Sequence, residues 1–146
     1  MNTGLLHLHN ALRWVILISL LMSIYKLYSK KDALKTSKIL LISSHSTLLL
    51  GLYQYFFGAV GFKMIQAAGM GVAMKDATTR FWAVEHISSM LIAIVLITIG
   101  HISYKKTQNA SKTTVFYVIA LLLIVLAMPW PFREGIGRPW FPGMGM

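Results

Sequence analysis

Five histidines lie in a chain that is otherwise strongly apolar: His7, His9, His45, His86 and His101. Ionisable side chains are costly in apolar segments and therefore tend to mark function. His86 and His101 belong to one apolar run and are 15 residues apart, which places them about 60° apart around a helix and roughly 22 Å apart along it. They share a helix face and lie near its opposite ends, which is the arrangement needed to hold one haem near each surface of a membrane.

The depths of the other histidines match these two. Counted from the outer ends of the predicted helices, His9 and His86 lie about 6 and 7.5 Å deep. Counted from the inner ends, His45 and His101 lie about 9 and 4–5 Å deep, an offset of about 5 Å that helix tilt can absorb. The sequence therefore predicts an outer pair, His9 with His86, and an inner pair, His45 with His101.

Two neutral imidazoles that project inward from different helices at one depth are the ligands of a bis-histidine haem. We therefore predict His9, His86, His45 and His101 as iron ligands of one or two b-type haems. Arg13 lies one turn below His9 on the same face, where it could pair with a haem propionate or with a quinone oxygen.

Two assignments near the outer pair stay open. His7 competes with His9 for the outer site, because it lies about 200° around the same helix; the deeper position favours His9. Glu85 points about 100° away from the neighbouring histidine, and we expect it to pair with Arg13, Arg80 or an arginine of the C-terminal tail.

Structural alternatives exist for these residues. A lone transmembrane histidine often makes only a hydrogen bond between helices, and the serines around His45 favour that reading for it; Arg13 could be a snorkelling or charge-paired residue. A further constellation consists of methionines on the predicted outer side, whose thioethers suit Cu(I): Met64, Met70, Met74, Met144 and Met146. Their spacing is not that of a tight metal motif, which favours a structural role.

Composition defines the class of protein. The 146 residues are 56% hydrophobic and 12% charged, with a mean hydropathy of +0.64, which indicates one integral membrane domain covering 1–146. The absence of cysteine excludes disulfides, iron–sulfur clusters, thiolate ligation of haem and covalent c-type attachment. Of the ten lysines, eight lie in two short loops, a pattern that indicates the cytoplasmic side of a membrane rather than binding to nucleic acid.

The predicted fold is all-α, an integral membrane four-helix bundle. Apolar runs predict spanning helices over about 5–28, 39–57, 81–104 and 109–128. Four crossings place both termini on one side, and the lysine bias makes that side the periplasm or the cell exterior of a bacterial inner membrane. The segment 58–80 predicts a short amphipathic outer helix between the second and third spans, and the Pro- and aromatic-rich tail 129–146 predicts an ordered cover at the interface.

Several stretches resemble small four-helix membrane proteins described as cytochrome b-like. They are HLHNALRW, SHSTLLLGLYQYF, RFWAVEH with GH fifteen residues on, and PWPFREGIGRPWF. The resemblance covers most of the chain. It implies b-type haem, electron transfer within the membrane and contact with quinone, and it carries His9, His45, His86 and His101 over as ligands.

The functional hypothesis is a membrane cytochrome b that carries electrons across or within the bilayer, with exchange with quinone left open. As an enzyme it would be a quinone-linked oxidoreductase or its cytochrome b subunit, alone, as a homo-oligomer or beside other respiratory subunits. Two rivals are a haem-free accessory subunit of a membrane respiratory or transport complex and a copper-handling membrane protein.

Overall fold

Long apolar runs must satisfy their own backbone hydrogen bonds in a bilayer, and helices do so within each segment. The computed structural model describes residues 3–144, and within that range four segments are helical, long and apolar enough to cross a membrane. Their main helices are α1 (Thr3–Tyr28), α2 (Leu34–Phe57), α6 (His86–Thr107) and α7 (Ala110–Ala127). The predicted all-α, membrane-spanning four-helix bundle is confirmed.

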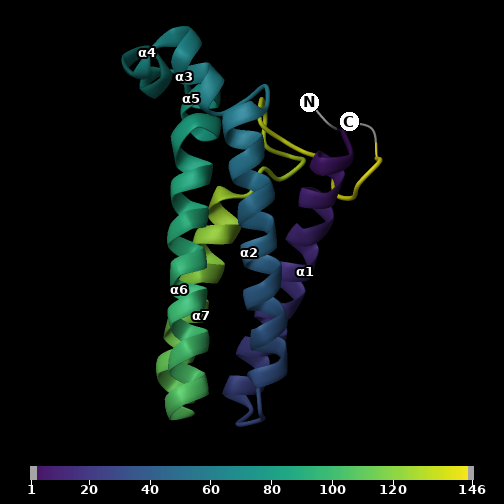
Figure 1. Ribbon diagram of the computed structural model, residues 1–146, viewed down its shortest axis with the longest axis vertical. Helices are drawn as coiled ribbons and strands as arrows, with labels where there is room; N and C mark the ends of the chain where they lie inside the picture. The colour runs from purple at the N-terminus through teal and green to yellow at the C-terminus, as the bar shows by residue number, and fades with distance from the viewer. Residues whose placement is uncertain (1–2, 145–146) are drawn as a thin grey trace.

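The bundle consists of two helical hairpins, α1 with α2 and α6 with α7, packed side by side (Figure 1). Both hairpin turns lie at one end, next to the clustered lysines, and we call this the lysine end. The two ends of the described chain and the tail 129–144 lie at the opposite end (Figure 1), which we call the tail end. The structure thus places both ends of the described chain on one side, as predicted.

Hydroxyl groups allow α2 to begin earlier than its apolar run. The helix starts at Leu34 rather than near residue 39. Thr36 lies in its first turn, where its hydroxyl donates to the Ala33 carbonyl at 3.1 Å and accepts from Ser23 of α1 at 3.0 Å. Polar side chains that bond each other across helices can be buried, so the helix continues into sequence that composition alone assigns to a loop.

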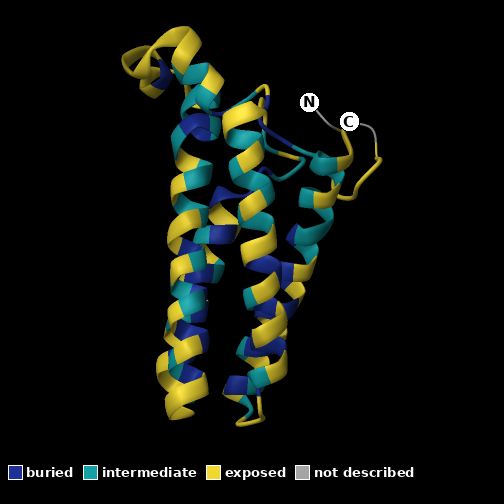
Figure 2. Cartoon of the chain, in the orientation of Figure 1, coloured by how far each residue is buried: buried dark blue, intermediate teal, exposed yellow. Residues whose placement is uncertain are grey.

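A buried polar cluster holds the two hairpins together near the lysine end. The Ser37 hydroxyl contacts His101 Nδ1 at 2.8 Å and also hydrogen-bonds the Tyr117 hydroxyl. Tyr104 adds a further link by accepting from the backbone amide of Ala33 at 3.2 Å. Buried residues concentrate in this half of the bundle (Figure 2), so its interior is closed by side chains.

The segment between α2 and α6 is helical as predicted but is divided into three short helices. These are α3 (Phe62–Ala68), α4 (Met70–Lys75) and α5 (Ala77–Arg80). Gly69, with φ of 81°, separates the first two, because a positive φ favours glycine. Together they form an exposed cap beyond the tail end of the bundle (Figures 1 and 2).

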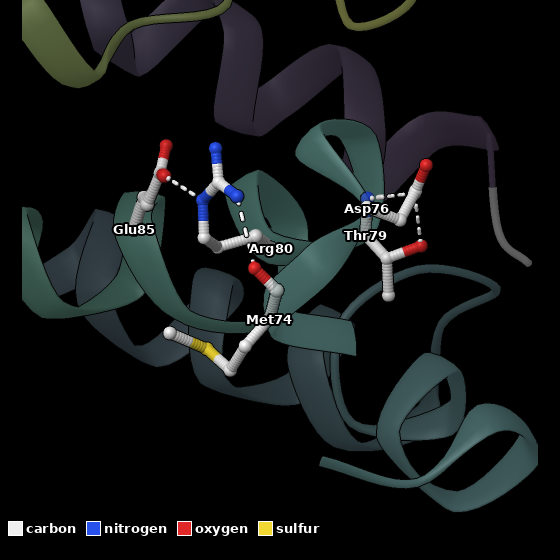
Figure 3. A network of polar contacts seen from close by, with 5 residues as sticks. All are labelled: Met74, Asp76, Thr79, Arg80 and Glu85. Carbon is white, nitrogen blue, oxygen red and sulfur yellow. Dashed lines mark hydrogen bonds and ion pairs between the residues drawn. The ribbon is translucent and has the colours of Figure 1, made fainter. Parts of the chain in front are cut away.

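A π-helical turn, η1 (Phe81–Glu85), joins this cap to α6. Figure 3 shows the polar contacts around it. Asp76 caps α5 by accepting from the Thr79 amide at 2.8 Å and its hydroxyl at 2.6 Å. Arg80 pairs with Glu85 at 2.6 Å and donates to the Met74 carbonyl at 2.9 Å. Of the three partners expected for Glu85, the structure selects Arg80.

The Asp76 cap should be sensitive to acid. Hydrogen bonds from the hydroxyl and amide of Thr79 lower the pKa of Asp76 below its ordinary value, so the cap stabilises α5 above about pH 4 and is lost as the pH falls through the lowered pKa. We expect Asp76→Ala to reduce the protection of the Thr79 amide against hydrogen exchange at neutral pH. The difference from wild type should shrink as the pH falls further below about 4; a difference that does not change with pH would contradict this account.

Gly100 allows α6 to approach α7. A β-carbon at this position would lie 2.8 Å from Cε1 of Tyr117, whose side chain is fully buried. Gly100→Ala should therefore lower the free energy of unfolding by about 1–3 kcal/mol, less a helix-propensity gain of up to ~1 kcal/mol. Thermal unfolding in detergent measures this. Gly71→Ala is the control, because nothing lies within 4 Å of a β-carbon there, and it should leave stability unchanged or raised.

Candidate functional site: a cavity at the tail end

The fourth spanning helix, α7, is too short to extend to the tail end of the bundle. α7 has 18 residues, against 26 in α1 and 24 in α2, and it ends just before Pro129, which cannot continue a helix. The tail that follows returns over the open quarter of the bundle (Figure 1). Helical walls on three sides and an irregular wall on the fourth leave a space between them.

That space is a cavity of about 350 Å³, within the range of small-molecule sites. Its walls come from α1, α2, η1, α6, the end of α7 and the tail, and most of its lining is apolar. The polar side chains in the lining include His9, Asn10, Arg13, Gln54 and His86. We call it the tail-end cavity.

The structure brings the predicted outer pair together in this cavity. The ring centres of His9 and His86 are 6.5 Å apart, with their planes inclined by 47°. Bonds from an imidazole nitrogen to a first-row metal are about 2.0–2.1 Å long, as for zinc, so two imidazoles on opposite sides of one metal have ring centres roughly 6–6.5 Å apart. The separation of the pair is therefore that of two imidazoles able to share one metal.

The backbone fixes the protonation pattern of His86. Nδ1 of His86 lies 2.8 Å from the Ala127 carbonyl, and because a carbonyl only accepts, Nδ1 carries the hydrogen. In the neutral ring, Nε2 then has a free lone pair. A ring N–H bonded to a backbone carbonyl is the usual support of a metal-ligating histidine, because it fixes both tautomer and orientation.

His9 approaches α2 closely because residue 51 is glycine. A β-carbon at Gly51 would lie 3.4 Å from Nε2 and 3.8 Å from Cδ2 of His9, which is van der Waals contact. The edge of the His9 ring that carries Nε2 therefore faces α2 at this position, and a side chain larger than alanine there would crowd it.

Arg13 has partners that the sequence did not indicate. Its Nη2 donates to the carbonyls of Pro139 and Trp140 at 3.0 and 2.7 Å. Asn10 and Trp14 donate to the same two carbonyls at 3.2 and 2.7 Å. One face of α1 thus holds the tail in place, which gives Arg13 a structural role beside the predicted role in binding a cofactor.

His7 also contacts the tail and lines the cavity. Its Nδ1 accepts from the Gly143 amide at 3.3 Å, so in the neutral ring the hydrogen lies on Nε2. The ring centre of His86 lies 6.5 Å from that of His9, so the geometry favours His9 over His7 as its partner.

The predicted inner pair, His45 with His101, is wrong as a pair. His45 is exposed on the outside of the bundle, and its Nδ1 contacts the Leu41 carbonyl of its own helix at 2.9 Å. His101 is buried and contacts Ser37, which lies eight residues, or about 12 Å, nearer the lysine end than His45. The two histidines differ in both depth and direction.

Three buried polar atoms around the tail-end cavity have no hydrogen-bond partner among the described residues. They are Asn10 Oδ1, Arg13 Nε and Gln54 Nε2. Unsatisfied buried groups are costly and call for an explanation, and a bound polar molecule would supply one. Sequence reasoning overlooked Asn10 and Gln54, although an amide within an apolar run was a signal available for Gln54.

The copper hypothesis gains no support from the geometry. Among residues 3–144, no three His, Asp or Glu side chains lie close enough to hold a metal ion by themselves. Met70, Met74 and Met144 are exposed, and Met146 lies outside the described residues.

No protein-family model matches the chain, and no curated protein or solved structure matches it significantly. The resemblance to cytochrome b-like proteins therefore stays a prediction, and the functional argument depends on the cavity itself.

The contacts of Arg13 predict how firmly the tail is held. Arg13→Gln removes two charge-assisted hydrogen bonds, each worth about 1.5–3 kcal/mol, so amide exchange in residues 140–144 should accelerate at least about tenfold. Hydrogen exchange followed by mass spectrometry measures this. Lys63→Gln removes an exposed positive charge at the same end and should leave exchange in the tail unchanged; equal acceleration in both variants would contradict the assignment.

Proposed function

We propose that the protein is a membrane-bound b-type cytochrome that carries electrons in the membrane and holds one haem in the tail-end cavity, where His9 and His86 would hold its iron. The observation that supports this most directly is the pair of imidazoles 6.5 Å apart in an apolar cavity. The hydrogen bond from His86 to Ala127 adds the expected support of a ligand.

The residues around the cavity fit such a group. Two imidazoles from different helices, an apolar lining and unsatisfied polar atoms at its edge are what an amphipathic macrocycle with polar substituents requires. When bound, haem supplies reversible one-electron chemistry at its iron. His9 and His86 would hold the iron with two imidazoles, which favours electron transfer over oxygen chemistry.

The other two predicted ligands do not fit a second haem. His45 faces away from the bundle interior, and His101 lies among buried side chains outside the cavity lining. The proposal is therefore for one haem, although the sequence allowed one or two.

The lysine bias orients the protein in the membrane. Lysine-rich short loops stay in the cytoplasm, so the tail-end cavity lies near the periplasmic or outer surface of a bacterial inner membrane. A quinol dissolved in the bilayer, or a donor at that surface, would supply the electron.

The test is the reduced-minus-oxidised visible spectrum of protein purified in detergent, with haem quantified as the pyridine haemochrome. We expect sharp reduced α and Soret bands and about one haem per chain. His86→Ala and His9→Ala should each abolish the low-spin spectrum or remove most of the haem. His45→Ala is the matched control and should retain both.

Either of two results would overturn the proposal. One is a flat spectrum from folded wild-type protein prepared with ample haem; a haem-free subunit of a larger complex would then be the better hypothesis. The other is a His86→Ala protein with its low-spin spectrum intact.

A further inference from the structure

The two arginines of the tail differ in their hydrogen bonding. Arg133 stacks on Phe81 at 4.8 Å, and its Nη1 donates to the carbonyls of Leu126 and Met128 at 3.2 and 3.0 Å. Arg138 stacks on Trp82, also at 4.8 Å, but its guanidinium donates to no acceptor and pairs with no carboxylate among residues 3–144. Within that range it is a half-buried cation without a carboxylate partner.

The backbone around Arg138 is fixed. The Arg138 amide donates to the Pro129 carbonyl at 3.0 Å and closes the loop that begins there. Gly137 lies inside this loop, where a β-carbon would be 2.8–2.9 Å from the carbonyls of Trp130, Pro131 and Arg133. Only glycine fits, so the position of Arg138 is set by the loop.

Arg138 lines two hollows of the molecule. It lines the tail-end cavity and, with Trp82 and Val60, a second recess of about 390 Å³ between the tail and the cap. Arg138 therefore lies between the tail-end cavity and this recess. Partial burial lowers the pKa of Arg138 below its ordinary value, yet an arginine remains protonated at physiological pH.

We propose that Arg138 binds a carboxylate of the molecule held in the tail-end cavity. The inference rests on the proposed function, under which that carboxylate is a haem propionate. A guanidinium presents a planar fork of N–H donors that matches the two oxygens of a carboxylate. Stacking on the Trp82 ring orients this fork. Arg13, the arginine first expected in this role, already binds two carbonyls of the tail.

The test is a double-mutant cycle between the side chain and the ligand. Purified haem-free wild type and Arg138→Gln are each titrated with haem and with haem dimethyl ester, which lacks both carboxylates. A lost charge-assisted hydrogen bond should weaken haem binding to Arg138→Gln at least about tenfold. Esterification should weaken binding to wild type by a similar factor, and should have little further effect on Arg138→Gln.

Matched variants separate this role from folding. Arg80→Gln removes a positive charge at the same end, from an arginine already paired with Glu85, and should behave as wild type. Arg138→Lys keeps the charge but not the fork and replaces Arg138→Gln in the cycle if that variant does not fold. It should show a smaller effect of esterification than wild type.

Three results would overturn the inference. The first is an equal cost of esterification in wild type and Arg138→Gln. The second is an equal loss of affinity for haem and for its diester in Arg138→Gln. The third is a saturable effect of acetate on tryptophan fluorescence that requires Arg138, together with no loss of affinity on esterification, because the site would then bind a free carboxylate.

The inference can also be judged if wild type binds no haem, a result that would refute the proposed function. Acetate is then the probe, with intrinsic tryptophan fluorescence and thermal unfolding as readouts. A saturable response that Arg138→Gln abolishes would support a carboxylate site at Arg138. No response would overturn it.

Discussion

The end of α7 determines the structure of the whole tail end. The last carbonyls of a helix have no partner within it, and in a membrane they cannot remain unsatisfied. Pro131 has no N–H to bond the Ala127 carbonyl four residues before it, so that carbonyl is free for His86 at 2.8 Å. Trp130 Nε1 donates to the Val125 carbonyl at 2.8 Å, and Arg133 caps the carbonyls of Leu126 and Met128. Capping of one helix end thus orients a candidate ligand and directs the tail back over the bundle.

The two ends of the bundle use polar groups in opposite ways. At the lysine end, Ser37, His101 and Tyr117 satisfy one another. At the tail end, polar atoms of Asn10 and Gln54 are buried beside the cavity without hydrogen-bond partners in the described part of the chain. Satisfied buried networks make a structure rigid and specific, whereas unsatisfied ones are costly. This contrast favours the tail end, rather than the lysine end, as the place where a ligand binds.

Periodicity and hydropathy were sufficient to predict the four-helix fold, because long apolar runs identify the segments that can lie in lipid. The depth of each histidine along its helix also predicted the pairing of His9 with His86, because the sequence marks the outer ends of both helices well. It was wrong for His45 because α2 begins at Leu34 rather than near residue 39, and because depth says nothing of direction around the helix. Residues 37, 44 and 51 of α2, seven apart, face the interior, and this period would have placed His45 about 100° away from it. The contacts of Arg13 with the tail join residues 126 and 127 positions apart, and no local pattern encodes them.

The tail wall has a consequence for biogenesis. Of the segments that enclose the cavity, the tail is the last to leave the ribosome, after all four spanning helices. Until the tail folds back, the face of the bundle that carries His9 and His86 therefore lacks its irregular wall. The hydrogen bonds of Arg13 and Trp14 with the carbonyls of Pro139 and Trp140 then hold that wall in place. The cavity is thus completed by the last segment of the described chain to be synthesised, after the helices against which that segment packs.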